Sequence, residues 1–264
     1  MTDYIRLFKR YMVLSAMNLI EYRVSFYLRI VGFIFSVFFN ILFWDVIFSG
    51  ISSFNGWSFG DVMVLQGMVA FYISLFWIFL RGSADISERV IDGGFNQFLA
   101  RPMNVLVSTV LSEINLGALD FGLTGIIYFI VAANTGTQIA LLPLLVSFIM
   151  VSLAAIIFAM IIMTLGSLAF WIGRFDVSEF IHSIMNSFFD YPIYIYPATL
   201  QFFLTLVIPL GFIQTFPTQV ATSNVALSQA FYWILIELAL LAFWYFILNF
   251  VFSKGIKRYE GHGV

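Results

Sequence analysis

Six long apolar runs alternate with shorter polar segments along the chain. The runs cover about residues 30–48, 62–80, 103–133, 139–172, 193–216 and 230–252. A helix needs roughly 20 apolar residues to cross a hydrocarbon core about 30 Å thick, so each run is long enough for one crossing. The pattern therefore predicts an all-α polytopic membrane protein with six transmembrane helices.

Two of the runs predict irregular helices. The run at 139–172 is about 34 residues, or roughly 51 Å of helix, so we expect it to tilt, to project from the bilayer or to break near Gly166. Pro192 and Pro197 lie at the entry of the fifth run and predict a kink or break there, because proline lacks a backbone donor. A short separate helix is expected at about 177–189, lying at the cytoplasmic interface.

The basic residues fall on one side of this predicted topology. All 12 Lys and Arg residues lie in alternate segments, namely 1–29, 81–104, 173–192 and 253–264. The segments between them contain none, near 49–60, 134–138 and 217–229. Because basic loops are retained in the cytoplasm, the sequence predicts that both termini are cytoplasmic.

The first 29 residues predict a helix that does not cross the membrane. Apolar residues such as Ile5 and Met12 recur near helical spacing among Arg6, Lys9 and Arg10. This pattern is typical of an amphipathic helix in the headgroup region, with its basic residues facing anionic lipid. A frayed basic tail is the alternative.

The whole chain, 1–264, is expected to form a single membrane domain. It would consist of an interfacial helix at 1–29, six spans over 30–252 and a cytoplasmic tail at 253–264.

Composition excludes several classes of function. Hydrophobic residues make up 62% of the chain and charged residues 10%, against about 25% charged in soluble domains, so lipid must surround most of the surface. The absence of cysteine excludes disulfides and thiolate chemistry. The basic residues are few and dispersed, so no nucleic-acid partner is expected. No G-x-x-x-x-G-K-[ST] motif is present, so we expect no cofactor or metal in this chain, and ATP and magnesium on a partner.

Residues Gly56-Trp57-Ser58-Phe59-Gly60 match the G-x-S-x-G pattern of a serine nucleophile. Such a serine needs a nearby base, usually a histidine. The two histidines, His182 and His262, are expected on the cytoplasmic side, whereas Ser58 is expected in an outer loop. A glycine-rich turn is therefore the better interpretation, and an intramembrane enzyme is disfavoured.

Four acidic residues fall inside predicted spans, where a charge costs roughly 2.5–3.5 kcal/mol. They are Asp45 near the outer end of the first run, Glu113 and Asp120 in the third run and Glu237 in the sixth. Glu113 and Asp120 are seven residues apart, which places them on one helical face. One interpretation is a polar stripe in a substrate pathway for cationic or amphipathic cargo, and the other is hydrogen bonding between helices.

The segment 81–104 is the longest polar stretch between two spans. Ser83 is expected to cap a short helix that runs to Asp92, and Gly93-Gly94 to end it. The helix mixes charged and apolar residues, which favours a surface that docks on a cytoplasmic protein and moves the adjoining spans. A simple connecting loop is the alternative, but it would not need the aromatic and leucine residues found here.

Several of these features occur together over nearly the whole chain. An amphipathic N-terminal segment and six spans accompany two stretches after the second span, Ile91-Asp92-Gly93-Gly94-Phe95 and Phe98-Leu99-Ala100-Arg101-Pro102. In this combination the chain resembles an ABC-2 type transporter permease, the membrane subunit of an exporter. The ending Lys257-Arg258-Tyr259-Glu260-Gly261-His262-Gly263 resembles the branch that includes viologen exporters. The resemblance implies a multi-pass permease of the prokaryotic inner cell membrane, active in export such as multidrug efflux.

The resemblance also implies partners. Two permease chains, identical or homologous, would form one pathway as a dimer, and two copies of a separate ATP-binding cassette ATPase would dock beneath. The chain itself would be non-catalytic, and its cargo would be a hydrophobic, amphipathic or cationic compound. A coupling helix would enter a groove of the ATPase, and by analogy it consists of Ile86, Ser87, Glu88, Arg89, Val90, Ile91, Asp92, Gly93, Gly94 and Phe95.

An ion-coupled secondary transporter is the alternative function. It would use Glu113, Asp120 or Glu237 as proton carriers and would work alone in a proton gradient. The sequence has no inverted-repeat pattern and few charges within the spans, and both observations weigh against this alternative.

Overall fold

The computed structural model describes residues 2–21, 23–100, 102–173 and 177–259. The chain is 82% helical, and its described residues contain no β-strand, so the all-α prediction is confirmed. The first half contains α1 (Thr2–Glu21), α2 (Arg23–Gly50), α3 (Phe59–Leu75), α4 (Ile86–Ile91), α5 (Asn96–Leu99), α6 (Val105–Leu111) and α7 (Leu119–Asn134). The second half contains α8 (Leu141–Ser167), α9 (Ala169–Ile172), α10 (Val177–Phe188), α11 (Ala198–Phe202), α12 (Phe216–Ala221) and α13 (Leu227–Arg258).

Turns of tighter or wider geometry extend several of these helices. α3 continues through a π-helical turn, Phe76–Leu80, into a 3₁₀ turn, Arg81–Ser83. Further 3₁₀ turns, at Leu116–Ala118 and Ile193–Ile195, precede α7 and follow α10. Between α11 and α12 the chain forms two π-helical turns, Phe203–Val207 and Gly211–Thr215.

Five continuous helical stretches are long and apolar enough to cross a membrane. They are Tyr27–Gly50, Phe59–Ile91, Leu116–Asn134, Leu141–Ile172 and Leu227–Arg258. A sixth candidate, Ala198–Val207 with Gly211–Ala221, is a pair of helices bent by 80°. The chain is therefore a multi-pass membrane protein with five to six candidate spans. The predicted irregular entry of the fifth run is confirmed, because Pro192 precedes a 3₁₀ turn and Pro197 is the N-cap of α11, and a further break occurs at Pro209.

The third predicted run, 103–133, is two helices rather than one. α6 ends at Leu111, and Asn115 interrupts the chain before α7, where its side-chain oxygen accepts a hydrogen bond from the Gly117 backbone (3.0 Å). Asparagine side chains compete with the helix for backbone groups in this way. The prediction that one continuous helix presents Glu113 and Asp120 on a single face is therefore wrong.

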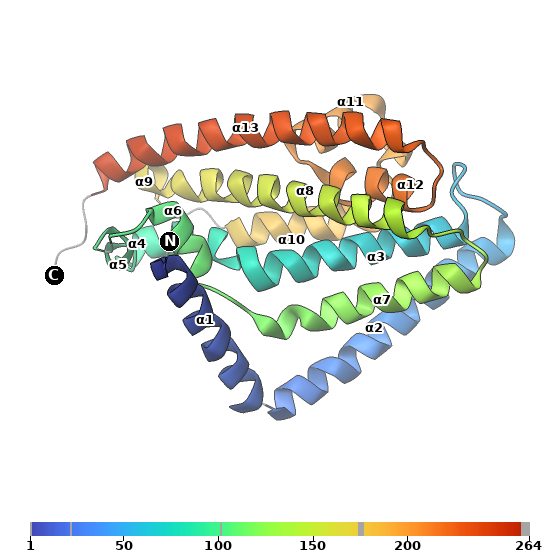
Figure 1. Ribbon diagram of the computed structural model, residues 1–264, viewed down its shortest axis with the longest axis horizontal. Coiled ribbons are helices and arrows are strands. Elements are labelled where there is room, and N and C mark those ends of the chain that lie inside the picture. The colour runs from blue at the N-terminus through green and yellow to red at the C-terminus, as the bar shows by residue number, and fades with distance from the viewer. Residues whose placement is uncertain (1, 22, 101, 174–176, 260–264) are drawn as a thin grey trace.

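α10 is the short helix predicted at about 177–189, but it does not lie across the end of the bundle. It runs along the same direction as α3 and α8 (Figure 1). Val177, Ile181 and Ile184 are 2–5% exposed and belong to the main core. Because these residues recur every three or four positions, they form one apolar face that packs inward. The predicted interfacial placement is therefore wrong.

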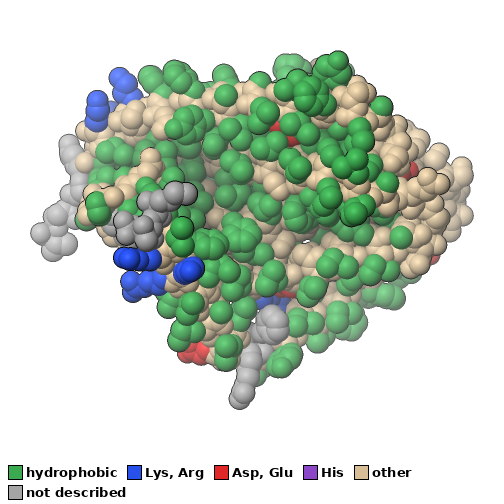
Figure 2. All heavy atoms as spheres, in the orientation of Figure 1, with side chains coloured by type: hydrophobic (Ala, Val, Ile, Leu, Met, Phe, Trp, Pro, Cys, Tyr) green, Lys and Arg blue, Asp and Glu red, His purple; other side chains and the backbone are tan. Residues whose placement is uncertain are grey.

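The bundle has two distinguishable ends. α3, α7, α8 and α13 lie roughly side by side, whereas α2 diverges from them (Figure 1). The beginning of α1 and the end of α13 lie at the same end of this bundle, where α4, α5 and α6 also lie. Most of the Lys and Arg side chains visible in Figure 2 gather there, and hydrophobic side chains cover much of the remaining surface. We call this end the basic end.

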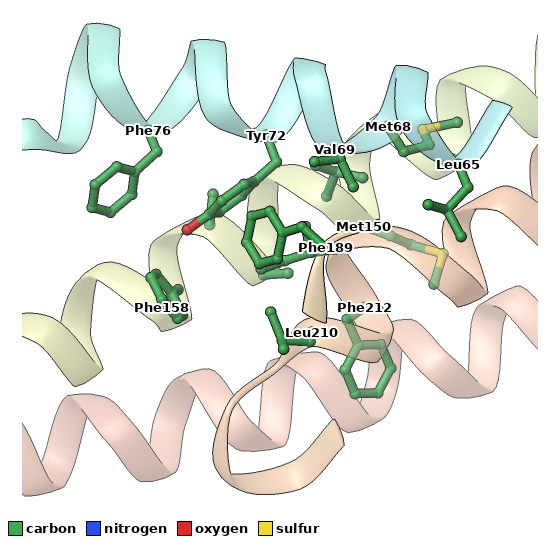
Figure 3. Packing of buried hydrophobic residues seen from close by; sticks show 14 of the residues in the cluster. Leu65, Met68, Val69, Tyr72, Phe76, Met150, Phe158, Phe189, Leu210 and Phe212 are labelled. Carbon is green, nitrogen blue, oxygen red and sulfur yellow. The ribbon is translucent and has the colours of Figure 1, made fainter. Parts of the chain in front are cut away.

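The main core lies between α3, α8, α10 and the bent segment that follows α10. The Tyr72 ring makes edge contacts with Phe158 and Phe189, whose ring centroids lie 5.9 and 5.4 Å away. Figure 3 shows these rings turned toward one another, with Leu210 close by. All four side chains are at most 3% exposed, so the core closes around the inner face of α10.

The G-x-S-x-G sequence forms a turn and a helix cap. Asn55 and Gly56 have positive φ angles of 49° and 81°. The Ser58 hydroxyl accepts a hydrogen bond from the Asp61 backbone (3.2 Å) and donates one to the Asp61 carboxylate (2.7 Å), which caps α3. The interpretation of this motif as a turn is confirmed.

Candidate functional site

Residues 81–104, the α3–α6 connection, are packed against the basic end, and all but residue 101 are described. α4 buries Ile86, Ser87 and Val90, each at most 6% exposed, against α8 and α9. Phe95 is fully buried in an aromatic cluster with Phe98, Phe170, Phe252 and Tyr259, whose ring centroids lie 5.5–6.2 Å from its own. The α3–α6 connection is therefore a folded part of the bundle rather than a simple loop.

The two ends of α4 differ in how well the sequence predicts them. Ser83 does not cap the helix, because its hydroxyl donates to the Leu80 carbonyl (2.6 Å) within the 3₁₀ turn. Asp85 occupies the N-cap position instead and makes no capping hydrogen bond with its side chain. The predicted stop is confirmed, because Gly93 has a φ of +74°, which glycine adopts without steric cost.

Arg89 is the centre of an internal network of charges. Its Nη2 lies 3.1 Å from Asp85 Oδ2 and 3.2 Å from Glu113 Oε1, and its Nη1 donates to Ser112 Oγ at 2.6 Å. Arg81 Nε lies 3.7 Å from the second oxygen of Glu113. Only 15% of the Arg89 side chain is exposed. The network ties α4 to the chain break that follows α6.

Two acidic residues of α4 and its C-cap remain exposed. Glu88 and Asp92 are four residues apart and so lie on the same side of the helix. Asp85 and Arg89 pair with each other, so they leave little net charge on this surface. Of the ten residues predicted to form a docking helix, these two give the exposed surface its acidic character.

α4, α8 and α10 meet at Gly166. A Cβ atom at this position would lie 3.3 Å from Ile86 Cβ and 3.7 Å from Val177 Cγ2. A larger side chain would therefore push α4 and the start of α10 away from α8. α8 therefore contacts both α4 and the first turn of α10 at Gly166.

A polar cavity of about 300 Å³ lies near the other end of α10, among α2, α3, α7 and α10. Asn40, Gln66, Tyr128 and Asp190 line it together with apolar side chains. The Tyr128 hydroxyl donates to Asn40 Oδ1 (3.0 Å), and Gln66 Nε2 donates to the Asp190 carbonyl oxygen (3.2 Å). No Lys or Arg occurs among the described residues of the lining, so Asp190 gives the cavity a negative charge.

The face of α10 opposite its buried face is polar. Ser183 and Ser187 are exposed on it, and Asp190 continues the same line just beyond the helix. A serine hydroxyl in a helix can donate to the carbonyl four residues earlier, as Ser147, Ser152 and Ser167 of α8 do, so the serines alone carry no large cost in hydrocarbon. The exposed Asp190 carboxylate would be costly there, and it favours a hydrophilic pathway or a second protein chain beside this face.

The three acidic residues predicted for a substrate pathway lie apart from one another. Glu113 belongs to the Arg89 network at the basic end. Asp120 Oδ2 lies 2.8 Å from Arg29 Nε, and this ion pair joins α7 to α2. Glu237 is completely buried on α13, and neither of its carboxylate oxygens has a hydrogen-bond partner among the described residues. None of the three lines the polar cavity, and their role in a pathway stays a prediction.

None of the polar residues of this cavity is predicted from the sequence as a site residue. Asn40 and Gln66 are isolated polar residues inside apolar runs, and that signal could have marked them. Asp190 is hidden by the assignment of 173–192 to a cytoplasmic segment, where a carboxylate costs little. The position of Tyr128 depends on how α2 packs against α7, which no local pattern reveals.

A helical bundle with an apolar surface, five to six candidate spans and a polar cavity among its helices is typical of a multi-pass membrane transport protein. A family model described as ABC-2 family transporter protein matches residues 14–263. The chain therefore belongs to the ABC-2 transporter family, as the resemblance of its sequence indicates. No curated protein and no solved structure matches it.

Permeases of this family are membrane components of ABC transporters. They are generally non-catalytic and generally pair with an ATP-binding cassette ATPase. The narrower resemblance to viologen exporters stays a prediction. Arg101 and residues 260–263, on which parts of the quoted motifs fall, lie outside the described residues.

Proposed function

We propose that this chain is the permease subunit of an ABC exporter. It forms the cargo pathway with a second permease chain, identical or homologous, and two copies of a separate ATPase drive it. The observation that carries this proposal is α4, which is fixed to the bundle by its buried face and by Arg89 while Glu88 and Asp92 stay exposed. The ATPase binds ATP and magnesium, since this chain has no P-loop motif.

The basic end faces the cytoplasm of a prokaryotic cell, because basic segments are retained on that side of the inner membrane. Both termini are then cytoplasmic. α1 lies in the inner headgroup region, where its exposed apolar residues Val13, Met17 and Ile20 contact acyl chains and Lys9 and Arg10 contact phosphates. This placement also puts α4 where a cytoplasmic ATPase can reach it.

The ATPase docks on the exposed side of α4. Since Glu88 and Asp92 are acidic, the groove that receives them carries basic side chains. The apolar side of the helix, with Ile86 and Val90, transmits the force of docking into the bundle. Closure of the ATPase pair therefore displaces α4 against α8 at Gly166, and α8 passes the movement to the first turn of α10, which it contacts there.

The cargo passes along the polar face of α10. A second permease chain on the other side of this pathway shields Ser183 and Ser187 from lipid. Asp190 favours cationic cargo, and the apolar part of the cavity lining favours compounds with hydrophobic surface. Hydrophobic, amphipathic or cationic compounds are the classes that fit this combination.

Charge reversal on α4 tests the docking. The double variant Glu88→Arg with Asp92→Arg replaces two attractive contacts by repulsive ones, so we expect the ATPase that copurifies in mild detergent to fall at least about tenfold. Asp45→Arg is the matched control, because Asp45 is also exposed but lies in the last turns of α2, away from the basic end. It should retain the ATPase.

A second variant tests the helix itself. Val90→Pro places proline in the last turn of α4, where it removes a backbone donor and clashes with the preceding turn, and it should give the same loss of ATPase. The docking assignment is wrong if either variant keeps the ATPase and still supports ATP-dependent transport. Transport by the chain alone in liposomes, driven by a proton gradient without ATP, would refute the wider proposal and favour a secondary transporter.

A further inference from the structure

Two cavities adjoin beside α2. The polar cavity measures about 300 Å³, and an apolar cavity of about 220 Å³ lies in the groove between α2 and α7. Phe33, Val37 and Thr124 line both cavities. The two spaces therefore share a wall made of these three residues, and one ligand that displaces their side chains can occupy both.

The apolar cavity borders the lipid-facing surface. Its lining includes Ile34, Leu123 and Ile127, which are 60%, 61% and 40% exposed. In a bilayer these side chains contact acyl chains, because the hydrocarbon core surrounds the apolar surface of the spans. An apolar tail can therefore enter this groove from the bilayer without leaving a hydrocarbon environment.

The polar cavity retains hydrogen-bonding capacity. Asn40 uses its side-chain oxygen for the Tyr128 hydroxyl, and Gln66 uses its side-chain nitrogen for the Asp190 carbonyl. The amide nitrogen of Asn40 and the amide oxygen of Gln66 are then left for a ligand. Asp190 adds a negative charge that no Lys or Arg among the described lining residues neutralises.

The other carboxylate near these cavities is already paired. Asp120 lines the apolar cavity, but its Oδ2 lies 2.8 Å from Arg29 Nε. Arg29 also donates to the Gly117 carbonyl (2.9 Å), so the ion pair is fixed in place. A positively charged group on a ligand is therefore attracted to Asp190 in the polar cavity. It is not attracted to the apolar cavity, where Asp120 is already paired with Arg29.

We propose that the two cavities together form one binding site for a single-chain cationic amphiphile, with its charged head beside Asp190 and its apolar tail in the groove between α2 and α7. The inference rests on the proposed function, because it names the class of cargo that the permease carries. A small cation without a tail leaves the groove unfilled. An anionic amphiphile is repelled by Asp190.

Photolabelling of the full chain in lipid nanodiscs tests this site. The probe is dodecyltrimethylammonium with a photoreactive diazirine at the end of its tail, and labelled residues are mapped by mass spectrometry. We expect labels on α2 and α7 within the groove. Excess unlabelled dodecyltrimethylammonium should reduce this labelling at least about tenfold, whereas tetramethylammonium and dodecyl sulfate at the same concentration should not.

Two variants separate the head from the tail. Asp190→Asn removes the charge and should lower about tenfold the part of the labelling that excess unlabelled dodecyltrimethylammonium prevents. Asp45→Asn is the control and should not lower it, because Asp45 is exposed and lies outside both cavities. Ile34→Trp fills the groove and should abolish labelling there. Val46→Trp is its control, since Val46 is 62% exposed on the same helix but lines neither cavity.

Uniform labelling of lipid-facing residues, unaffected by the competitors or by these variants, would overturn the inference. The outcome is independent of the ATPase. A chain that retains its ATPase through α4 but labels uniformly refutes the amphiphile site alone. A chain that labels specifically but binds no ATPase refutes the proposed function alone.

Discussion

Acidic residues at the basic end and in the middle of the bundle have different partners. At the basic end, Asp85 and Glu113 each lie within 3.2 Å of the Arg89 guanidinium. In the middle, Glu237 is buried without a hydrogen-bond partner among the described residues. Asp190 lines a cavity whose described residues include no Lys or Arg. The carboxylates of this chain therefore fall into two groups, those that pair with an arginine and those without a cationic partner among the described residues.

The difference follows from what each region has to do. A carboxylate paired with arginine fixes the helices that carry the pair, because its attraction offsets part of the cost of removing both charges from water. A carboxylate without a cationic partner carries more of that cost. The α3–α6 connection is thus held by ion pairs where we propose that force enters, and the cavity keeps a carboxylate with no Lys or Arg among its described lining residues where we propose that cargo binds.

Among the tests of how tightly the α3–α6 connection is packed, substitution of Gly82 should have the largest effect on stability. A Cβ atom there would lie 2.3 Å from the Thr109 carbonyl oxygen and 2.7 Å from that of Val110. Both obstacles are backbone atoms of α6, which cannot move aside as a flexible side chain can. We expect Gly82→Ala to lower the free energy of unfolding by about 3 kcal/mol, measured by titration with sodium dodecyl sulfate in mixed micelles.

Gly32→Ala is the matched control, because no atom lies within 4 Å of a Cβ at that position of α2. Alanine favours a helix over glycine, so this variant should be unchanged or more stable by up to about 1 kcal/mol. If Gly82→Ala is instead as stable as the wild type, the α3–α6 connection is not held tightly against α6.

Arg89 gives the next largest effect. Arg89→Ala leaves Asp85 and Glu113 facing each other without the central cation, and we expect a loss of about 2 kcal/mol in the same titration. Arg81→Ala should cost less, because Arg81 is 39% exposed and lies 3.7 Å from Glu113. Combining Arg89→Ala with Glu113→Gln should cost less than the sum of the single changes. Strict additivity would show that the network has no energetic role.

The long apolar helices are the part of the fold that the sequence predicts best. The run at 62–80 lies within the helical stretch Phe59–Ile91, and the run at 139–172 matches the stretch Leu141–Ile172. An almost continuous apolar sequence suits a helix surrounded by lipid or by other helices. A break near Gly166 is one of the three alternatives that the sequence leaves open for the second of these runs, and α8 ends at Ser167, separated from α9 by Leu168 alone.

Less predictable are the places where a single polar group competes with the helix, or where a helix mixes polar and apolar faces. Asn115 divides an apolar run that otherwise predicts one span. α10 has the composition of an interfacial helix, but its apolar face fits the bundle core better than the headgroup region. The polar cavity depends on contacts such as that between Tyr128 and Asn40, which are 88 residues apart, so no local pattern could predict it.

Substitution of Glu237 has the smallest expected effect on stability, but it distinguishes most clearly between paired and unpaired carboxylates. The Glu237 carboxyl group is surrounded by the bundle and unpaired, so Glu237→Leu removes a buried polar group while keeping a similar volume. We expect the free energy of unfolding to rise by about 1 kcal/mol in the same titration. Asp120→Leu is the control, and it should lower the free energy of unfolding. It removes the carboxylate that lies 2.8 Å from Arg29 Nε, so the guanidinium loses its ion pair. If Glu237→Leu destabilises the protein as Asp120→Leu does, Glu237 has a partner and belongs with the paired carboxylates of the basic end. If the variant is more stable but no longer transports, the unpaired carboxyl is kept for function, as we propose for Asp190.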